Sequence, residues 1–492
     1  MPRSSGILLH ITSLPSPGGI GSLGHEAYAF ADFLQASGMR IWQVLPIGPT
    51  GYGESPYQSS SVFAGKPLLI SCDLLREQGL LKAPPEENFM PAEEEKVDYD
   101  AVRKNKTALL RKAFAQSGKR MEKEIEAFRK ENPWVEDFAL FTALKEKFGG
   151  VMWTKWPDAA LRLRKPEAMD RARRELKDEI SFHVFCQMLF RRQWFDLKRY
   201  CNERGILIFG DMPIYVAEDS ADTWANPKVF QLNHDRTPKR VAGVPPDYFS
   251  EDGQLWGNPL YRWAYLRFIR RFDWWVDRMK GMASLYDMIR IDHFIGFANY
   301  YSIPSGAPNA RNGKWVIGPQ AALFRKLKKE VPDIRIVAED LGATNKRVRR
   351  LLDWCGYPGM KVLCFGFDSD ETNPHFIGNY TENYVAYTGT HDNDTALGWA
   401  EKADPKVLAF AEKTLGFHGA KEAPAAMVRA LFACPCETVI VPMQDLLELG
   451  GDARMNYPGT IGGNWLWRMK DGALTADLSM RLYKLNRETS RL

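Results

Sequence analysis

Four acidic residues of this 492-residue sequence lie at or just after the ends of short apolar runs. They are Asp211, Asp292, Glu339 and Asp392. Two carboxylates that face one sugar can cleave or transfer a glycosidic bond, because one attacks the anomeric carbon while the other protonates the leaving oxygen. A single Asp after a strand is often only the N-cap of the next helix. Helix capping does not explain why four acids would converge, because clustered carboxylates repel one another; a shared function would explain it.

The residues beside two of these acids suggest how the roles are divided. Arg290 and Asp292 are two positions apart, so both side chains face the same way on a strand. A neighbouring guanidinium favours an ionised carboxylate, which suits Asp292 as a nucleophile, although a purely structural ion pair has the same pattern. Glu339 follows the apolar run 334–338, where a drier environment raises the pKa of a carboxyl group and suits a proton donor. Spacing alone does not settle which acid takes which role.

Histidines beside two of the acids bear on alternative chemistries. His391 precedes Asp392, and together they offer hydrogen-bonding groups for the vicinal hydroxyls of a sugar, although His391 alone fits a structural role equally well. The acids could also bind Mg²⁺ or Ca²⁺, but the adjacent cationic Arg290 and the His293 and His391 side chains make a hard-cation site less attractive. No phosphate-loop, zinc-protease or nucleophile-elbow motif occurs, so the sequence predicts neither a metal nor a cofactor.

The elements that must position these acids are eight short apolar, β-branched runs. Strands that alternate with helical patterns eight times predict a parallel (β/α)8 barrel, whose chemistry sits at the carboxyl ends of its strands. The acids follow the third, fourth, fifth and seventh runs. The predicted strands are Ile7–Ile11, Ile41–Leu45, Ile206–Phe209, Leu285–Ile291, Ile334–Ala338, Lys361–Phe367, Tyr384–Tyr387 and Thr438–Pro442.

Helical periodicity is clearest in three places between these runs. One apolar stripe ends at Gly38, a C-cap signal, and another begins after Thr344, a possible N-cap. The three stripes consist of Ala27, Phe30, Ala31 and Leu34; Leu323, Phe324, Leu327 and Val331; and Val348, Leu351, Leu352 and Cys355.

The uneven spacing of the runs predicts insertions into a single catalytic barrel that spans residues 1–492. We expect an inserted loop region over 49–83 and a largely helical inserted subdomain over 84–200. The segment 213–258 is dense in proline, glycine and aromatic residues, which is typical of a substrate-binding loop. Little sequence follows the eighth run, so no C-terminal β-domain is expected.

Composition excludes several other classes of protein. The net charge of +5 is small for this length and gives no support for a nucleic-acid partner. No stretch of about 20 apolar residues predicts a membrane span, and the N-terminal apolar run is too short for a signal peptide. Seven scattered cysteines favour thiols in a reducing, cytoplasmic compartment. Aromatic residues reach 12%, which suits sugar stacking but also core packing.

The motifs around these acids resemble those of the 4-α-glucanotransferases, also called amylomaltases or disproportionating enzymes, which form glycoside hydrolase family 77 in the α-amylase superfamily. The resemblance covers residues from about 6 to 470 and is highly specific. Its motifs are GYGESPYQ at 51–58, GDMPIYVA at 210–217, GVPPDYFSEDGQLWGNP at 243–259, RIDHFIGF at 290–297, VAEDLG at 337–342, PGMKVL at 358–363, YTGTHDNDT at 387–395 and MNYPGTIGGNWLWR at 455–468.

The resemblance implies a retaining transfer of α-1,4-glucan segments to the 4-hydroxyl of glucose or another glucan. It implies Asp292 as nucleophile, Glu339 as acid/base and Asp392 as stabiliser of the transition state. Maltooligosaccharides, glucans and glucose would be the substrates, with no cofactor, metal or obligate protein partner. The residues that would bind the substrate are Tyr57, Asp211, Asp247, Gln254, Trp256, Arg290, His293, Phe365 and His391.

Two departures and two rival functions stand beside this resemblance. Ile295 occupies a position where many members have Arg, and Tyr301 replaces a frequent Trp, so donor or acceptor preference can differ. One rival is a hydrolase of the same architecture, and the other is a non-catalytic carbohydrate-binding protein on an inactive barrel. The intact Asp292, Glu339 and Asp392 argue against the second rival.

Overall fold

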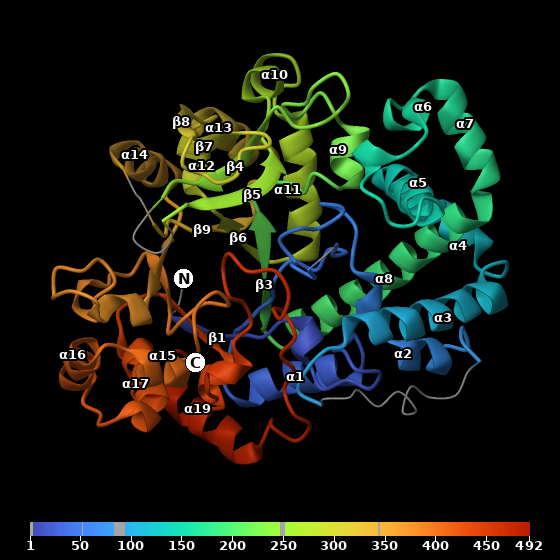
Figure 1. The fold of residues 1–492 in the computed structure, drawn as a ribbon. Coiled ribbons are helices and arrows are strands. Elements are labelled where there is room, and N and C mark those ends of the chain that lie inside the picture. The colour runs from blue at the N-terminus through green and yellow to red at the C-terminus, as the bar shows by residue number, and fades with distance from the viewer. Residues whose placement is uncertain (1–2, 52, 83–93, 247–250, 343–344) are drawn as a thin grey trace.

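Eight parallel strands form the central barrel of the protein (Figure 1). The computed structural model describes residues 3–51, 53–82, 94–246, 251–342 and 345–492. Around the sheet the strand order is β10-β11-β12-β1-β2-β3-β6-β9. The strands are β1 (Ser4–Leu8), β2 (Ile41–Gln43), β3 (Leu207–Pro213), β6 (Met288–Asp292), β9 (Arg335–Ala338), β10 (Gly359–Val362), β11 (Tyr384–Tyr387) and β12 (Thr438–Pro442).

The two edge strands of this sheet, β9 and β10, meet and nearly close the barrel. The backbone N–H of Ala338 donates to the carbonyl of Pro358 at 2.9 Å. The carboxylate of Asp340 accepts from the N–H of Met360 at 2.8 Å. The predicted (β/α)8 fold is therefore confirmed, and the side chains that follow the strands are carried to one rim of the barrel.

Each predicted strand overlaps an observed strand, and β11 and β12 have the predicted bounds. The other six predicted strands had wrong bounds at one or both ends, and three of these differences have a clear cause. The first strand is β1, which begins at Ser4 because Ser5 and Gly6, although not apolar, are buried in the barrel. Residues 285–287 precede β6, since Leu285 ends a helix. The run after β10 turns into a 3-10 helix, Leu363–Phe367, because its apolar side chains pack against a second core cluster.

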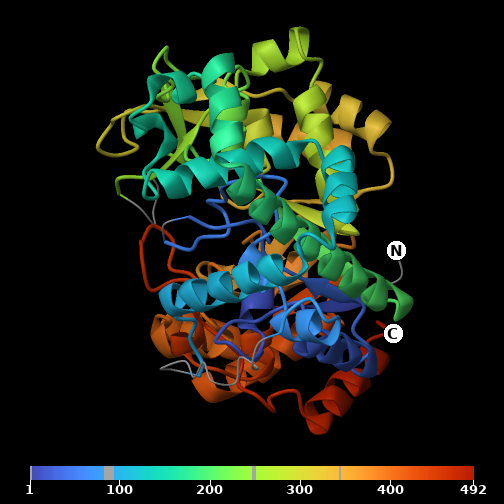
Figure 2. The same ribbon diagram turned by 90° about the vertical axis from the view of Figure 1, so that its right-hand side faces the viewer.

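Helices surround the barrel and form one broad flank beside it, on the right of Figure 1 and turned to the viewer in Figure 2. Among the described residues no helix is apolar over a length that would cross a bilayer. The helices are α1 (His25–Ala36), α2 (Cys72–Glu77), α3 (Tyr99–Ser117), α4 (Glu122–Glu131), α5 (Trp134–Lys147), α6 (Ala159–Arg162), α7 (Pro166–Glu175), α8 (Lys177–Glu203), α9 (Ala221–Ala225), α10 (Trp263–Phe268), α11 (Asp273–Leu285), α12 (Ile295–Ala298), α13 (Ala321–Glu330), α14 (Lys346–Cys355), α15 (Ala396–Lys402), α16 (Pro405–Leu415), α17 (Ala423–Ala433), α18 (Met443–Leu446) and α19 (Ala476–Glu488).

The three periodic stripes lie on α1, α13 and α14. Gly38 has φ +72° just after α1, as its C-cap signal predicted. Val331 follows the last turn of α13 and is not part of the helix. The N-cap of α14 is Asn345, whose side-chain oxygen accepts from the backbone of the first turn, whereas the predicted cap Thr344 lies outside the described residues.

The long helix α8 fastens the loops after β2 to the barrel. Gln187 makes two hydrogen bonds with the backbone of Gly65, at 2.8 and 2.9 Å. Gln193 makes the same paired contacts with Ser71, at 2.8 and 3.0 Å. Both glutamines are buried. Their side-chain amides supply the hydrogen bonds that a neighbouring strand would give the loop backbone in a sheet.

A four-stranded antiparallel sheet, which the sequence did not predict, lies beside the rim that carries the acids (Figure 1). It combines segment 213–258 with the connection that follows β6, so two distant parts of the sequence pair across β4 and β7. Its strands, in the order β5-β4-β7-β8, are β4 (Arg240–Val244), β5 (Gln254–Pro259), β7 (Asn299–Pro304) and β8 (Lys314–Ile317).

Candidate active site

A buried arginine joins two of the four acids. Asp211 on β3 and Arg290 on β6 are direct neighbours in the register of the two strands. Nη1 of Arg290 donates to Oδ2 of Asp211 at 2.6 Å, and Nη2 lies 2.9 Å from Oδ1 of Asp292. The Asp211 side chain is fully buried, whereas that of Asp292 is 29% exposed. Asp292 is thus the carboxylate of this pair that an incoming molecule can reach.

Glu339, which directly follows β9, is held by two backbone amides. Its Oε2 accepts from the N–H of His293 at 2.7 Å and its Oε1 from the N–H of Leu341 at 2.8 Å. Burial raises the pKa of Glu339 to about 8; Arg290 opposes this rise and Asp292 reinforces it. A carboxyl group with this pKa carries its proton at neutral pH, so Glu339 can serve as a proton donor.

His293 connects the turn after β6 to the rim. Its φ of +49° lies in the left-handed region, which a non-glycine residue adopts at a cost of order 1–3 kcal/mol. In that conformation its N–H reaches Glu339, and its ring lies edge-to-face on Trp256 with 4.9 Å between centroids. Burial lowers the pKa of His293 to about 4, so the ring is neutral at pH 7. Its Nε2 is buried and has no hydrogen-bond partner among the described residues.

An aromatic stack brings Tyr57 to the same rim. The Tyr57 hydroxyl donates to Oδ2 of Asp211 at 3.0 Å, and its ring stacks on His391 with 5.1 Å between centroids and an 11° angle. Trp465 lies against both rings, at 5.9 Å from each. The loop after β2, the loop after β11 and the segment before α19 therefore converge on one point.

Asp392 is held by two residues that sequence reasoning missed. Nδ2 of Asn456 donates to Oδ1 of Asp392 at 2.6 Å, and Nη2 of Arg454 donates to its backbone carbonyl, also at 2.6 Å. Nε2 of His391 lies 3.4 Å from the other carboxylate oxygen. Asn456 lies in the 455–468 motif and Arg454 directly precedes it, but no pattern in the sequence pairs them with an acid more than 60 positions away.

The remaining predicted binding residues are Trp256, Gln254, Phe365 and Asp247, and not all of them lie beside the acids. Trp256 and Gln254 share β5, and the indole N–H of Trp256 donates to Oε1 of Gln254 at 3.0 Å. The Phe365 ring lies in the 3-10 helix after β10, edge-to-face with His375 at 5.7 Å, and no ring contact in the described part of the chain joins it to the acids. Asp247 lies outside the described residues.

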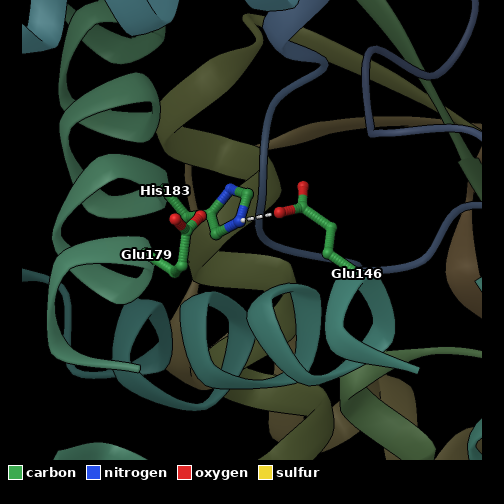
Figure 3. Close-up of side chains that lie close together, drawn as sticks. All are labelled: Glu146, Glu179 and His183. Atoms are coloured by element: carbon green, nitrogen blue, oxygen red, sulfur yellow. Dashed lines mark ion pairs between the residues drawn. The ribbon is translucent and has the colours of Figure 1, made fainter. Parts of the chain in front are cut away.

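A second group of polar side chains, Glu146, Glu179 and His183, lies on the facing helices α5 and α8 (Figure 3). Nε2 of His183 points to the Glu146 carboxylate at 3.4 Å. The Arg111 guanidinium bonds Glu179 at 2.5 Å and lies 3.4 Å from Glu146, so both acids already have a cationic partner. The arrangement is that of an ion-pair network that ties α5 to α8. At the rim, acids that share Arg290 do not form a comparable set of converging ligands within the described residues.

The chain is similar to known proteins over nearly its whole length. A family model described as 4-alpha-glucanotransferase, glycoside hydrolase family 77, matches residues 9–475. The chain belongs to the 4-alpha-glucanotransferase family. The 4-alpha-glucanotransferase of Clostridium butyricum is 44% identical over 488 residues, which cover 97% of this chain and 99% of that protein. The one from Thermus thermophilus is 45% identical and covers 100% of both chains.

A solved member of the 4-alpha-glucanotransferase family has nearly the same fold. The amylomaltase of Streptococcus agalactiae, determined in complex with acarbose, superposes with a TM-score of 0.96 at 42% identity and 99% coverage of both chains. The amylomaltase of Corynebacterium glutamicum shares the fold at 19% identity with a TM-score of 0.75. The protein is therefore an enzyme of the 4-alpha-glucanotransferase type and a carbohydrate-active transferase.

The buried pairing of Arg290 generates a stability prediction. Replacing Arg290 with Ala leaves the Asp211 charge buried and unpaired, so we expect the free energy of unfolding to fall by about 3–5 kcal/mol. The double variant Arg290→Ala/Asp211→Asn removes that charge and should recover part of the loss, measured by denaturant unfolding. Arg199→Ala breaks the exposed pair with Asp196 and serves as a control, with an effect below about 1 kcal/mol. Equal losses in the single and double variants would contradict the buried-charge explanation.

Proposed function

We propose that the protein transfers α-1,4-glucan segments by a double displacement in which Asp292 is the nucleophile. Its carboxylate attacks the anomeric carbon of the donor and forms a covalent glycosyl-enzyme. The 4-hydroxyl of glucose or of another glucan then displaces Asp292, so two inversions retain the α-configuration. The observation that carries this proposal is the Asp211–Arg290–Asp292 chain, which holds the Asp292 carboxylate beside a guanidinium and leaves it partly exposed.

In this mechanism Glu339 gives its proton to the departing glycosidic oxygen and then takes a proton from the acceptor. Its raised pKa supports the first step, because a group with a pKa of about 8 is protonated at neutral pH. Ionised Asp292 itself contributes to that rise. When the glycosyl-enzyme forms, this negative charge is lost and Glu339 becomes more acidic, which suits its second role as base.

Asp392 and His391 are proposed to hold the sugar at the cleavage point. Hydrogen bonds from hydroxyls to Asp392 strengthen as positive charge develops on the ring, so they stabilise the transition state more than the bound substrate. The two flanking contacts of the Asp392 carboxylate, from Asn456 and His391, fix its orientation. Arg290 is proposed to orient the Asp292 carboxylate through their contact, and Asp211 to hold Arg290 in place.

Other predicted residues are proposed to bind the glucan on either side of this point. Tyr57 and Trp256 expose aromatic surface at the rim, Gln254 lies beside Trp256, and neutral His293 offers its unbonded Nε2 to a sugar hydroxyl. Asp247 and Phe365 are assigned by the family resemblance alone. The insertions at 49–83 and 213–258 supply Tyr57 and β5, so we propose that they exclude water from the glycosyl-enzyme. The helical segment 84–200 is proposed to support the first of these insertions through α8.

We also propose a cytoplasmic location. Six cysteines outside the N-terminal third of the chain are buried and unlinked by disulfides, as is typical of a reducing compartment. They are Cys186, Cys201, Cys355, Cys364, Cys434 and Cys436.

Incubation with maltotriose alone tests the proposed transfer. We expect glucose plus a ladder of longer maltooligosaccharides, with few new reducing ends, because a sugar hydroxyl rather than water accepts the glycosyl group. Asp292→Asn should abolish the ladder while leaving the fold and glucan binding intact. Glucose and maltose alone, with one new reducing end per cleavage, would instead identify a hydrolase on the same barrel.

The pH dependence of kcat/KM tests the role of Glu339. Activity is expected to be nearly full at neutral pH and to fall as the pH rises through about 8, because the ionised Glu339 carboxylate cannot protonate a leaving sugar. With an α-maltosyl fluoride donor, whose leaving group needs no proton, this alkaline decline in donor cleavage should disappear. Persistence of the decline with the fluoride donor would assign it to another group.

Asn456→Ala tests the positioning of Asp392. Loss of the 2.6 Å hydrogen bond should lower kcat on maltotriose about tenfold with little change in KM, because the contact orients a group that acts in the transition state. Ile461→Ala changes an exposed side chain of the same segment and should leave kcat unchanged. A rise in KM with unchanged kcat would show that Asn456 binds substrate rather than positions Asp392.

A further inference from the structure

Two adjoining cavities lie away from the carboxylate rim, between the segment 226–239 and the helices α6 and α10. Their volumes are about 280 and 380 Å³, and both are lined by Pro227, Lys228 and Arg236. We call the combined space the basic groove. Seven of its lining residues are arginines or lysines, and no described carboxylate residue lines either cavity. This concentration of positive charge contrasts with the nearly balanced charge of the whole chain.

Some cations of the basic groove are neutralised and others are not. Arg164 pairs with Asp137, and Arg270 pairs with Asp273. In contrast, Lys228, Arg236, Lys239 and Arg262 make no ion pair with any described carboxylate, although all four line the groove. These four side chains therefore keep positive charges that no described carboxylate pairs.

Arg236 is the most unusual of these cations. It lies in a tight turn in which its N–H donates to the carbonyl of Asn233 at 3.1 Å, and its φ is +76°. This left-handed conformation is uncommon for arginine. The Nε atom is buried and has no hydrogen-bond partner among the described residues. A buried guanidinium N–H without an acceptor is costly, so an acceptor supplied by a ligand would relieve that cost.

Arg262 is held by an aromatic ring rather than by a carboxylate. Its guanidinium carbon lies 5.0 Å from the centroid of the Tyr265 ring. Stacking on a ring face leaves the in-plane N–H donors available. Within the described parts of the chain the side chain makes one hydrogen bond, to the carbonyl of Lys228, and it is long at 3.4 Å. Arg262 thus presents a planar fork of donors next to Lys228 and Arg236, the arrangement that matches phosphate oxygens.

We propose that the basic groove binds a phosphate monoester carried on a sugar, with the phosphoryl oxygens held by Arg236, Arg262 and Lys228. The volume of either cavity accommodates a sugar-sized ligand. The same chemistry is offered by a free sugar phosphate and by a phosphorylated glucosyl unit within a glucan. This inference does not depend on the proposed transfer mechanism.

A layer of stacked rings separates the basic groove from the carboxylate rim. Phe230 lines the groove and stacks on Tyr261 at 5.4 Å, and Tyr261 in turn stacks on Tyr215 at 6.3 Å. Tyr215 lies 6.4 Å from the His293 ring at the rim. Since the groove residues do not touch the acids, their substitution should leave transfer between short maltooligosaccharides unchanged.

Calorimetric titration of the full chain tests the proposal. The probes are inorganic phosphate, glucose 6-phosphate, a phosphorylated maltodextrin and unphosphorylated maltotriose. We expect glucose 6-phosphate or the phosphorylated maltodextrin to bind at least tenfold more weakly to Arg236→Ala/Arg262→Ala than to the unaltered chain, and binding to weaken with salt. Arg236→Lys/Arg262→Lys keeps the charge but loses the fork, so it should restore only part of the affinity.

Matched controls distinguish specific binding in the basic groove from non-specific binding of anions to positive surface charge. Lys406→Ala/Lys413→Ala removes two exposed cations on α16, at the other end of the molecule, and should leave binding unchanged (Figure 1). Preference for glucose 6-phosphate indicates a free sugar phosphate, and preference for the phosphorylated maltodextrin indicates a modified glucan. Equal binding by polyglutamate, unchanged affinity in the double alanine variant, or no binding of any phosphate probe up to about 10 mM would overturn the proposal. Circular dichroism confirms that each variant is folded.

Discussion

The pairing of one buried guanidinium with two carboxylates is the constraint on which the site depends. The Arg290 side chain is only 5% exposed, so its charge must be matched within the barrel. The parallel register of β3 and β6 places Asp211 directly beside it, and Asp292, opposite Pro213, is the last residue of the strand pair, at the open rim. One carboxylate is therefore closed within the barrel, and the other, which we propose as the nucleophile, is accessible.

This arrangement also sets the protonation of Glu339. A buried carboxyl group beside the Asp292 charge keeps its proton to about pH 8 even though it accepts two backbone hydrogen bonds. The strained turn at His293 supplies one of those bonds, so its conformational cost serves the position of Glu339. Retaining transfer requires one carboxylate that attacks and a second carboxyl group that holds a proton, and burial gives Glu339 the raised pKa that suits the second role.

The sequence predicted those features that depend on neighbours along the chain. Apolar runs located all eight barrel strands, and the residues after them located the four acids, because a barrel collects strand ends at one rim. It did not predict the antiparallel sheet, since β4 and β7 pair across about 60 residues and carry no clear alternation. It also missed Asn456 and Arg454, whose contacts with Asp392 depend on the path of the chain after β12. Residue type alone does not reveal such long-range hydrogen bonds.

Trapping the covalent intermediate tests the account most directly. In the variant Glu339→Gln, an α-maltosyl fluoride donor needs no protonated leaving group, but deglycosylation lacks its base, so the glycosyl-enzyme should accumulate. Mass spectrometry of the digested protein is expected to find one maltosyl group on the peptide that contains Asp292 and none in the variant Glu339→Gln/Asp292→Asn. A maltosyl group on another residue, or fluoride release that continues with Asp292 replaced, would contradict the assignment of Asp292 as the nucleophile.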